Sequence, residues 1–283
     1  VPSEVEGTLE PGQSTEVTKN VTTPTLLPKA DVVISMDLTG SMNDELVNLK
    51  SEIDSIITAL SGASADLNVG IVSHEDYVGY FDYCGYSATY GTAGKPDEPF
   101  RVDHAVDNNF TAASDAVQAM SLGDGGDWPE SYARVMWESG QADNLMGYRA
   151  DAQKILVMFL DAVPHDCGLD RNSGIDPGRD ATAGTDDDID LEDDAILAMQ
   201  ASGITLLVVY SGLTESWTGN DLALWNDIAG ETGGSAVQIN QDGTVPGGTS
   251  LTELIMDLIS EIKTDVWWEV TACTPGITVT LTP

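Results

Sequence analysis

Basic residues are scarce in this sequence. Lys and Arg number 11 against 47 Asp and Glu in 283 residues, which gives a formal net charge of −36. Such a surface repels nucleic acid and anionic membranes, so neither is an expected partner. The acidity suits a saline medium, where charges are strongly screened, or a protein that collects cations. No apolar run is long enough to span a membrane, and no signal-peptide pattern precedes Val1, so we expect no membrane insertion by this segment.

Catalytic signatures are also missing. The sequence contains no GxSxG, no HExxH and no phosphate-binding glycine loop. Its histidines, His74, His104 and His165, are scattered, and only His165 is expected near a functional site, where packing or loop capping is its favoured role. We therefore expect no enzymatic activity and assign no catalytic residue.

Cysteines are few. Cys84, Cys167 and Cys273 form neither a CxxC pair nor a zinc-finger spacing. An odd count fits either free thiols in the core or one disulfide with one cysteine left over. Cysteine usage alone does not identify a compartment.

The hydrophobic pattern predicts an α/β fold. Uninterrupted apolar runs, such as 155–160, are typical of parallel strands that are buried on both faces. They alternate with amphipathic helical patterns, so we predict a doubly wound, mostly parallel, Rossmann-like sheet with its sites outside the carboxyl ends of the strands. The expected strands cover 31–36, 67–73, 155–160, 204–210 and 235–239, and the expected helices cover about 44–60, 112–120, 132–139, 190–201, 221–229 and 250–263.

The two ends of the chain differ from this block. Residues 5–23 and 266–282 are rich in Thr and Val and are broken by Pro-Gly turns, as β-segments are. We expect an α/β domain over 29–265 that is inserted into a small β-sandwich-like unit formed by 1–28 and 266–283. The alternative is that the ends are edge strands of the main sheet or linkers.

The most informative motif follows the first buried strand. Asp37, Thr39 and Ser41 stand at positions i, i+2 and i+4 in a loop that leaves the strand end, which places three oxygen donors around one point. Mg²⁺ prefers oxygen ligands and commonly keeps several waters beside one or two carboxylates. Asp161 ends another buried strand in the same way. These residues predict a divalent-cation site.

Four separated segments within 31–165 resemble the von Willebrand factor A domain, and most closely the I-like domain of integrin beta subunits. They are Asp37-Leu38-Thr39-Gly40-Ser41-Met42-Asn43-Asp44-Glu45, Ser73-His74-Glu75-Asp76, Asp127-Trp128-Pro129-Glu130 and Leu160-Asp161-Ala162-Val163-Pro164-His165. From 166 to 265 only the general A-domain pattern supports the match.

The resemblance implies a row of ion sites. A central Mg²⁺ would be held by Asp37, Thr39, Ser41, Glu130 and Asp161. An adjacent site would use Asp44, Glu45 and the Ser41 carbonyl, and a third would use Asp76, Asp127, the Pro129 carbonyl and Glu130, with Ca²⁺ at both flanking sites. The sequence departs from the family at two positions: Glu45 stands where Asp is more common, and Gly125 stands where Asn is usual.

The resemblance also implies a function. It predicts an extracellular or cell-surface adhesion domain, in which an open position on Mg²⁺ accepts an Asp or Glu carboxylate from a protein ligand or from a partner surface subunit. The high acidity favours a microbial surface protein. One alternative is a metal-stabilised structural module of a large surface or matrix protein with no ligand at the ion. Another is an intracellular A domain of an ATP-driven complex, against which the flanking β-segments argue.

Three loop features complete the predictions. The segment from Tyr77 to Phe100 is the expected ligand-binding loop, and its tyrosines would either contact the ligand or pack the loop on itself. Residues 170–176 alternate oxygen-bearing side chains as calcium loops do, but Ala181 stands where an EF-hand has its glutamate, so an ordinary polar turn is favoured. If the A-domain fold is right, Cys84 and Cys167 both lie near the metal-bearing face, and we expect them to form a disulfide that leaves Cys273 free.

Overall fold

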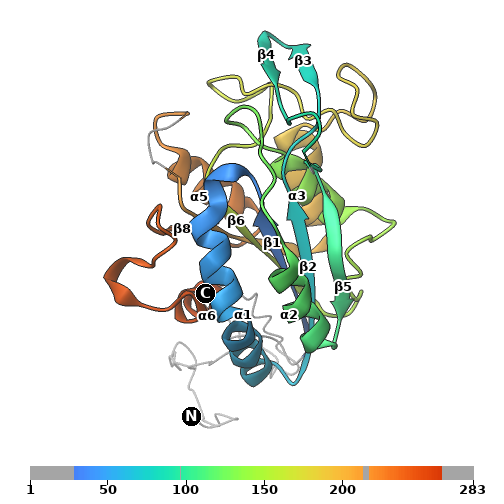
Figure 1. Cartoon of the computed structure of the whole chain (residues 1–283). Helices are drawn as coiled ribbons and strands as arrows, with labels where there is room; N and C mark the ends of the chain where they lie inside the picture. Colours follow the sequence, from blue (N-terminus) through green and yellow to red (C-terminus); the bar gives the residue numbers. More distant parts are fainter. Residues whose placement is uncertain (1–28, 96, 213–216, 263–283) are drawn as a thin grey trace, which may run out of the picture. The chain divides into compact units, whose positions relative to one another are not determined.

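The computed structural model describes residues 29–95, 97–212 and 217–262, which alternate between strands and helices (Figure 1). The strands are β1 (Lys29–Asp37), β2 (Asp66–His74), β3 (Tyr80–Tyr83), β4 (Tyr86–Thr89), β5 (Arg101–Asp107), β6 (Gln153–Leu160), β7 (Ile204–Tyr210) and β8 (Ser235–Gln238). The α-helices are α1 (Asn43–Ala63), α2 (Phe110–Ala119), α3 (Tyr132–Gly140), α4 (Leu197–Ser202), α5 (Asp221–Glu231) and α6 (Leu251–Ser260). Shorter helical turns are η1 (Gly40–Met42), the π-helical η2 (Leu191–Ile196) and η3 (Pro246–Gly248).

Six strands form one sheet in the order β5-β2-β1-β6-β7-β8. All neighbours pair in parallel except β5, which runs antiparallel to β2 at the edge. The mostly parallel α/β sheet expected from the apolar runs is therefore confirmed and is compatible with a Rossmann-like fold. The edge strand β5 was not predicted.

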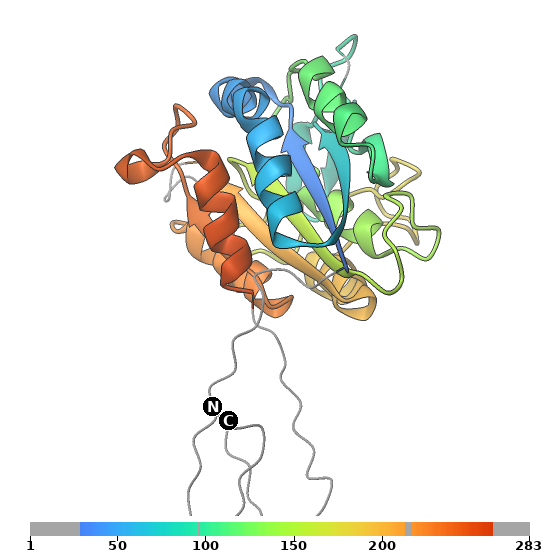
Figure 2. The same cartoon turned by 90° about the horizontal axis from the view of Figure 1, so that it is seen from below.

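Helices cover both faces of this sheet (Figures 1 and 2). One face packs against α1, α2 and α6, through side chains such as Leu49, Ile53 and Leu258. The other face packs against α3, η2, α4 and α5, with Trp225 fully buried there. Because the central strands are apolar on both sides, both faces are covered in this way.

The carboxyl ends of β1 and β6 lie side by side because the two strands pair in parallel register, with Met36 opposite Phe159. The chain order changes direction at this point, since β2 lies on one side of β1 and β7 lies beyond β6. Such a switch point leaves a crevice beyond the strand ends, where ligands bind in open α/β sheets. Asp37 and Asp161 both follow these strands, so the fold brings them to the same place.

The loop after β2 contains the separate hairpin β3–β4, at the top of Figure 1. A disulfide joins Cys84, in the hairpin turn, to Cys167, which follows β6 by several residues. The predicted Cys84–Cys167 bridge is thereby confirmed. It links the loop after β2 to the segment after β6, which both begin at the carboxyl ends of strands of the sheet.

Residues 1–28 and 263–283 lie outside the described residues, as does Cys273. The sandwich-like unit expected from the two ends therefore stays a prediction, together with its boundaries. Among the residues that the structure does describe, none of the helices combines the length and the apolar character needed to cross a membrane.

Candidate metal centre

The loop after β1 carries the first group of oxygen donors. Asp37 is fully buried, and its Oδ1 accepts a hydrogen bond of 2.8 Å from the Thr39 backbone N–H. The hydroxyls of Thr39 and Ser41 lie 3.3 Å apart. Thr39 is buried, whereas Ser41 is exposed. The spacing predicted from the sequence thus places three oxygen donors at one strand end, with Ser41 on the solvent side.

Asp161 and Glu130 approach this group from two other segments. Burial raises the pKa of Asp161, and the nearby Ser41 hydroxyl limits this rise. Burial, followed by repulsion from Asp161, raises the pKa of Asp37 to about 8. Glu130 is 4% exposed, and its Oε2 has no hydrogen-bond partner. Asp37 and Asp161 are near enough to Glu130 for their charges to raise its pKa, so the three carboxylates expected around the central ion are electrostatic neighbours.

Glycine at position 125 leaves room for this arrangement. Gly125 has a φ of +68°, and a Cβ there would lie 3.0 Å from Glu130 Oε1 and 3.1 Å from the Thr39 methyl group. A side chain would therefore crowd the carboxylate and also strain the backbone. Glycine, which stands here in place of Asn, lets Glu130 and Thr39 keep these positions without a shift.

The residues expected at the adjacent site are only partly enclosed. Glu45 is 3% exposed, and one of its oxygens, Oε2, has no hydrogen-bond partner. Burial raises its pKa to about 7, a hydrogen bond with Ser211 opposes the shift, and the charges of Asp161 and Asp44 add to it. Asp44 is exposed on the first turn of α1 and accepts a hydrogen bond from Asn43. Ser211, which follows β7, was not predicted from the sequence as a neighbour of Glu45.

The third group lies on the other side of Glu130. Burial raises the pKa of Glu130 well above its usual range, and the largest electrostatic contribution comes from Asp76, followed by Asp37 and Asp127. Burial is also the main cause that raises the pKa of Asp127 to about 7. Asp76 is fully buried. Pro129 is buried and directly precedes Glu130.

His165 belongs to this third group. One ligand atom from each of Asp76, Asp127 and His165 lies within 4.8 Å of the others, a separation that suits a metal ion. His165 is fully buried, and its ring stacks on Tyr90 at a centroid distance of 3.6 Å. Burial lowers its pKa, which favours the neutral imidazole that binds metals. The stacking on Tyr90 and the hydrogen bond to the Ser173 carbonyl agree with the predicted packing or capping role, and the position of His165 also makes it a candidate metal ligand.

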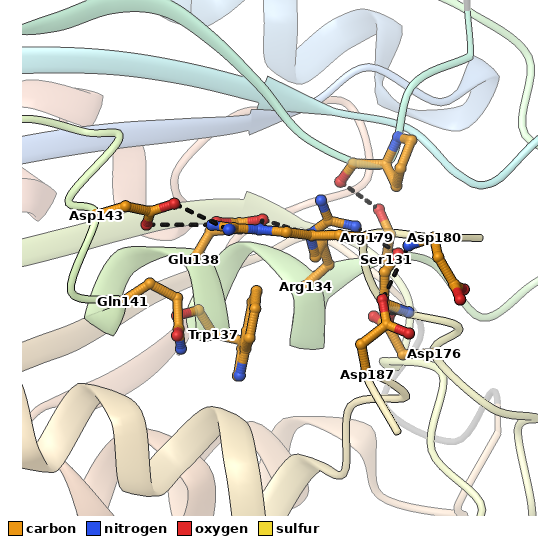
Figure 3. A network of polar contacts seen from close by, with 12 residues as sticks. Ser131, Arg134, Trp137, Glu138, Gln141, Asp143, Asp176, Arg179, Asp180 and Asp187 are labelled. Atoms are coloured by element: carbon orange, nitrogen blue, oxygen red, sulfur yellow. Dashed lines mark hydrogen bonds and ion pairs between the residues drawn. The ribbon is translucent and has the colours of Figure 1, made fainter. Parts of the chain in front are cut away.

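A network of polar contacts joins α3 to the segment around Asp176 (Figure 3). Asp176 is fully buried, and its Oδ1 accepts a hydrogen bond of 2.6 Å from the Tyr77 hydroxyl, which itself accepts one from Arg134. Arg134 and Arg179 both bind the buried carboxylate of Glu138 on α3. The network fixes the segment near Asp176 against α3.

The oxygen-bearing side chains of the segment 170–176 do not converge on one point, as the ligands of a calcium ion would. The Asn172 amide donates to the Cys84 carbonyl, the Ser173 hydroxyl contacts the Pro164 carbonyl at 2.7 Å, and Asp176 accepts from Tyr77. These oxygen-bearing side chains have three different partners. They hold the hairpin and the segment after β6 together.

The tyrosines of the expected ligand-binding loop divide into two groups. Tyr77 and Tyr90 are buried and pack with Phe81, and Tyr86 donates to Asp127 Oδ2 across 2.6 Å. Tyr80 and Tyr83 are exposed, at 66% and 43%. Self-packing thus accounts for the first group, whereas Tyr80 and Tyr83 are exposed at the two ends of β3.

Comparisons with known proteins support the fold. No protein-family model matches the chain, and no curated protein matches it. Among solved structures, the chain is similar to proximal thread matrix protein 1 from the mussel byssus, with a TM-score of 0.50 and 14% sequence identity. The match covers 84% of this chain and 50% of that protein, so this chain spans half of its length. At this identity the likeness shows the fold alone.

Proposed function

We propose that this chain is an extracellular, divalent-cation-dependent adhesion or recognition domain of the von Willebrand factor A type, closest to integrin beta I-like domains. The observation that carries the proposal is the cluster of five carboxylates at the strand ends: Asp37, Asp76, Asp127, Glu130 and Asp161. Their mutual repulsion in a buried place is costly unless cations neutralise it.

The geometry supports Mg²⁺ at the centre of this cluster. Asp37, Thr39, Ser41, Glu130 and Asp161 offer oxygen donors only, as hard divalent ions require. Octahedral Mg²⁺ keeps part of its sphere for water or an outside ligand. Because Ser41 is exposed, that open position would face solvent, where a carboxylate of a partner protein can reach it. No step of this chemistry breaks or forms a covalent bond, so the proposed role is binding and not catalysis.

The similarity to a byssus matrix protein favours one second candidate. A structural module of a surface or matrix protein would use the same ions to hold the loops together and would recruit no ligand. The low exposure of Glu130 and Asp161, at 4% and 9%, fits this role as well. The two functions differ in whether the exposed side of the central ion takes a partner.

Replacement of Ser41 separates these functions. We expect Ser41→Ala to weaken Mn²⁺ binding in calorimetry and to abolish Mg²⁺-dependent capture of partners from a cell-surface extract. Ser51→Ala is the matched control, because Ser51 only donates to a carbonyl on the outside of α1. Mn²⁺ binding without any capture that EDTA reverses would favour the structural module. A stripped protein that binds no Mn²⁺ would refute both.

A further inference from the structure

In the third group, the protein holds one oxygen of each carboxylate and leaves the other oxygen available for a metal ion. Asp76 Oδ1 accepts a hydrogen bond of 2.7 Å from the Tyr77 N–H, so its Oδ2 remains for another partner. Asp127 Oδ2 accepts from Tyr86, and its Oδ1 is buried without a partner. Each carboxylate therefore has one oxygen held by the protein and one oxygen left available. Such outer contacts orient metal ligands in known sites.

The hydrogen bond on the far side of His165 determines which ring nitrogen is available. Nδ1 lies 2.7 Å from the Ser173 carbonyl oxygen, which only accepts hydrogen bonds, so Nδ1 carries the proton. In the neutral ring Nε2 then presents a lone pair. That lone pair lies 3.2 Å from Asp76 Oδ2, another electron-rich atom. Without a metal a proton bridges these two atoms in a hydrogen bond, and a metal cation can take the place of that proton.

The distances fit a small ion with mixed nitrogen and oxygen ligands. Two ligands of a tetrahedral Zn²⁺, each about 2.0–2.1 Å from the metal, are about 3.4 Å apart. The separation of 3.2 Å between Asp76 Oδ2 and His165 Nε2 is close to that value. Glu130 offers a further buried oxygen, Oε2, that has no partner among the described residues. Water can complete the coordination.

From these contacts we infer that the third site is a transition-metal site of the Zn²⁺ class, with His165 as its nitrogen ligand. Imidazole suits Zn²⁺ and its neighbours, whereas Ca²⁺ takes six to eight oxygens. Gly125 contributes no side chain, and His165 supplies a ligand in the same neighbourhood. The inference deepens the proposed function and rests on it, and it replaces the Ca²⁺ that the resemblance implies at this site. The central Mg²⁺ assignment is unchanged.

Zinc titration of the whole chain tests this inference. Metal-stripped protein is titrated with Zn²⁺ by calorimetry, in excess Mg²⁺ and Ca²⁺ that occupy the oxygen sites. We expect one Zn²⁺ per chain in the wild type and at least about tenfold weaker binding in His165→Gln, since even the loss of an outer contact costs that much. His104→Gln is the matched control, because His104 pairs with Asp107 on the edge strand.

A second measurement does not depend on the variant. Crystals of the wild type grown with Zn²⁺ should give an anomalous peak at the zinc edge beside His165 Nε2. Equal Zn²⁺ affinity in His165→Gln, displacement of Zn²⁺ by Ca²⁺, or no such peak would overturn the inference. In those cases, Mn²⁺ binding to the wild type that Ser41→Ala weakens would still support the proposed function. Loss of Mn²⁺ binding in the wild type would instead remove both.

Discussion

Tyr132 donates its phenolic hydrogen to Asp37 Oδ2 across 2.5 Å. Both residues are fully buried, and the other oxygen of Asp37 accepts from the Thr39 N–H. The carboxylate at the end of β1 is therefore oriented by the first residue of α3, a helix on the opposite side of the site from α1. Tyr132 follows Glu130 by two residues, so one short segment supplies both a candidate ligand and the support of another.

Replacement of Tyr132 should show how far this support matters. Tyr132→Phe removes the hydrogen bond, and we expect Mn²⁺ affinity at the central site to fall about tenfold, as is typical when an outer contact of a metal ligand is lost. Tyr148→Phe is the control, since Tyr148 is a buried tyrosine that contacts a carbonyl in β6. Calorimetry that gives equal Mn²⁺ affinities for the two variants would contradict the expected role.

Gly125→Ala should weaken metal binding in addition to the stability that any side chain costs at a positive φ. Gly125 and Gly94 both have positive φ, at +68° and +85°, and either substitution should cost about 1–2 kcal/mol of stability. Only Gly125→Ala pushes against Glu130, because nothing lies within 4 Å of a Cβ at position 94. In EDTA, urea denaturation should give similar free energies of unfolding for the two variants. Titration with Mn²⁺ should give weaker binding for Gly125→Ala than for Gly94→Ala. Identical Mn²⁺ binding would show that Glu130 tolerates the methyl group.

Stability without metal should fall as the pH rises. Burial raises the pKa of Asp37 from 3.8 to about 8, so between these values the folded state holds a proton that the unfolded state has lost. The free energy of unfolding in EDTA should therefore decrease by at least about 2 kcal/mol from pH 5 to pH 8. Mg²⁺ should weaken or reverse this trend, because the cation replaces the proton. A flat pH profile in EDTA would be inconsistent with the raised pKa.

Removal of the disulfide should affect both stability and the third site. The double variant Cys84→Ser, Cys167→Ser opens a link between residues 83 apart, and we expect a loss of about 2–4 kcal/mol. Zn²⁺ affinity should also fall, because Cys167 lies two residues from His165. Cys273→Ser is the control for thiol removal. Intact-mass analysis after alkylation without reduction should count one free cysteine, and a count of three would exclude the bridge in solution.

The sequence predicted the central sheet well because its strands are buried on both sides. Uninterrupted apolar runs such as 155–160 have no other common explanation at that length, and they fall within the observed strands. The edge strand β5, Arg101–Asp107, was missed because it is polar and only partly buried, so neither a run nor a clean alternation marks it. The polar network around Glu138 was also invisible, since it joins residues about 40 positions apart.

The candidate site was predictable only where its residues follow strands. Asp37 and Asp161 stand at strand ends that parallel pairing must bring together, and the family resemblance added Glu130, Asp76 and Asp127. His165 could have been suspected from its place just after Asp161, but its contact with Asp76 depends on a loop without periodicity. Tyr132 carried no usable signal, and the alternation over 170–176 drew attention to Asp176 without predicting its contact with Tyr77.

A single parallel bridge joins the segment of Glu130 to the segment after β6. The Glu130 N–H donates to the Val163 carbonyl, and the His165 N–H donates to the Glu130 carbonyl, each across 3.0 Å. Candidate ligands of the central and third sites are thus fixed to the same few peptide groups. If metals bind at both sites, we expect occupancy at one to change the affinity at the other, and by thermodynamic reciprocity the factor is equal in both directions. The two metals would then bind with coupled affinities, so the occupancy of the domain would depend on the concentrations of both.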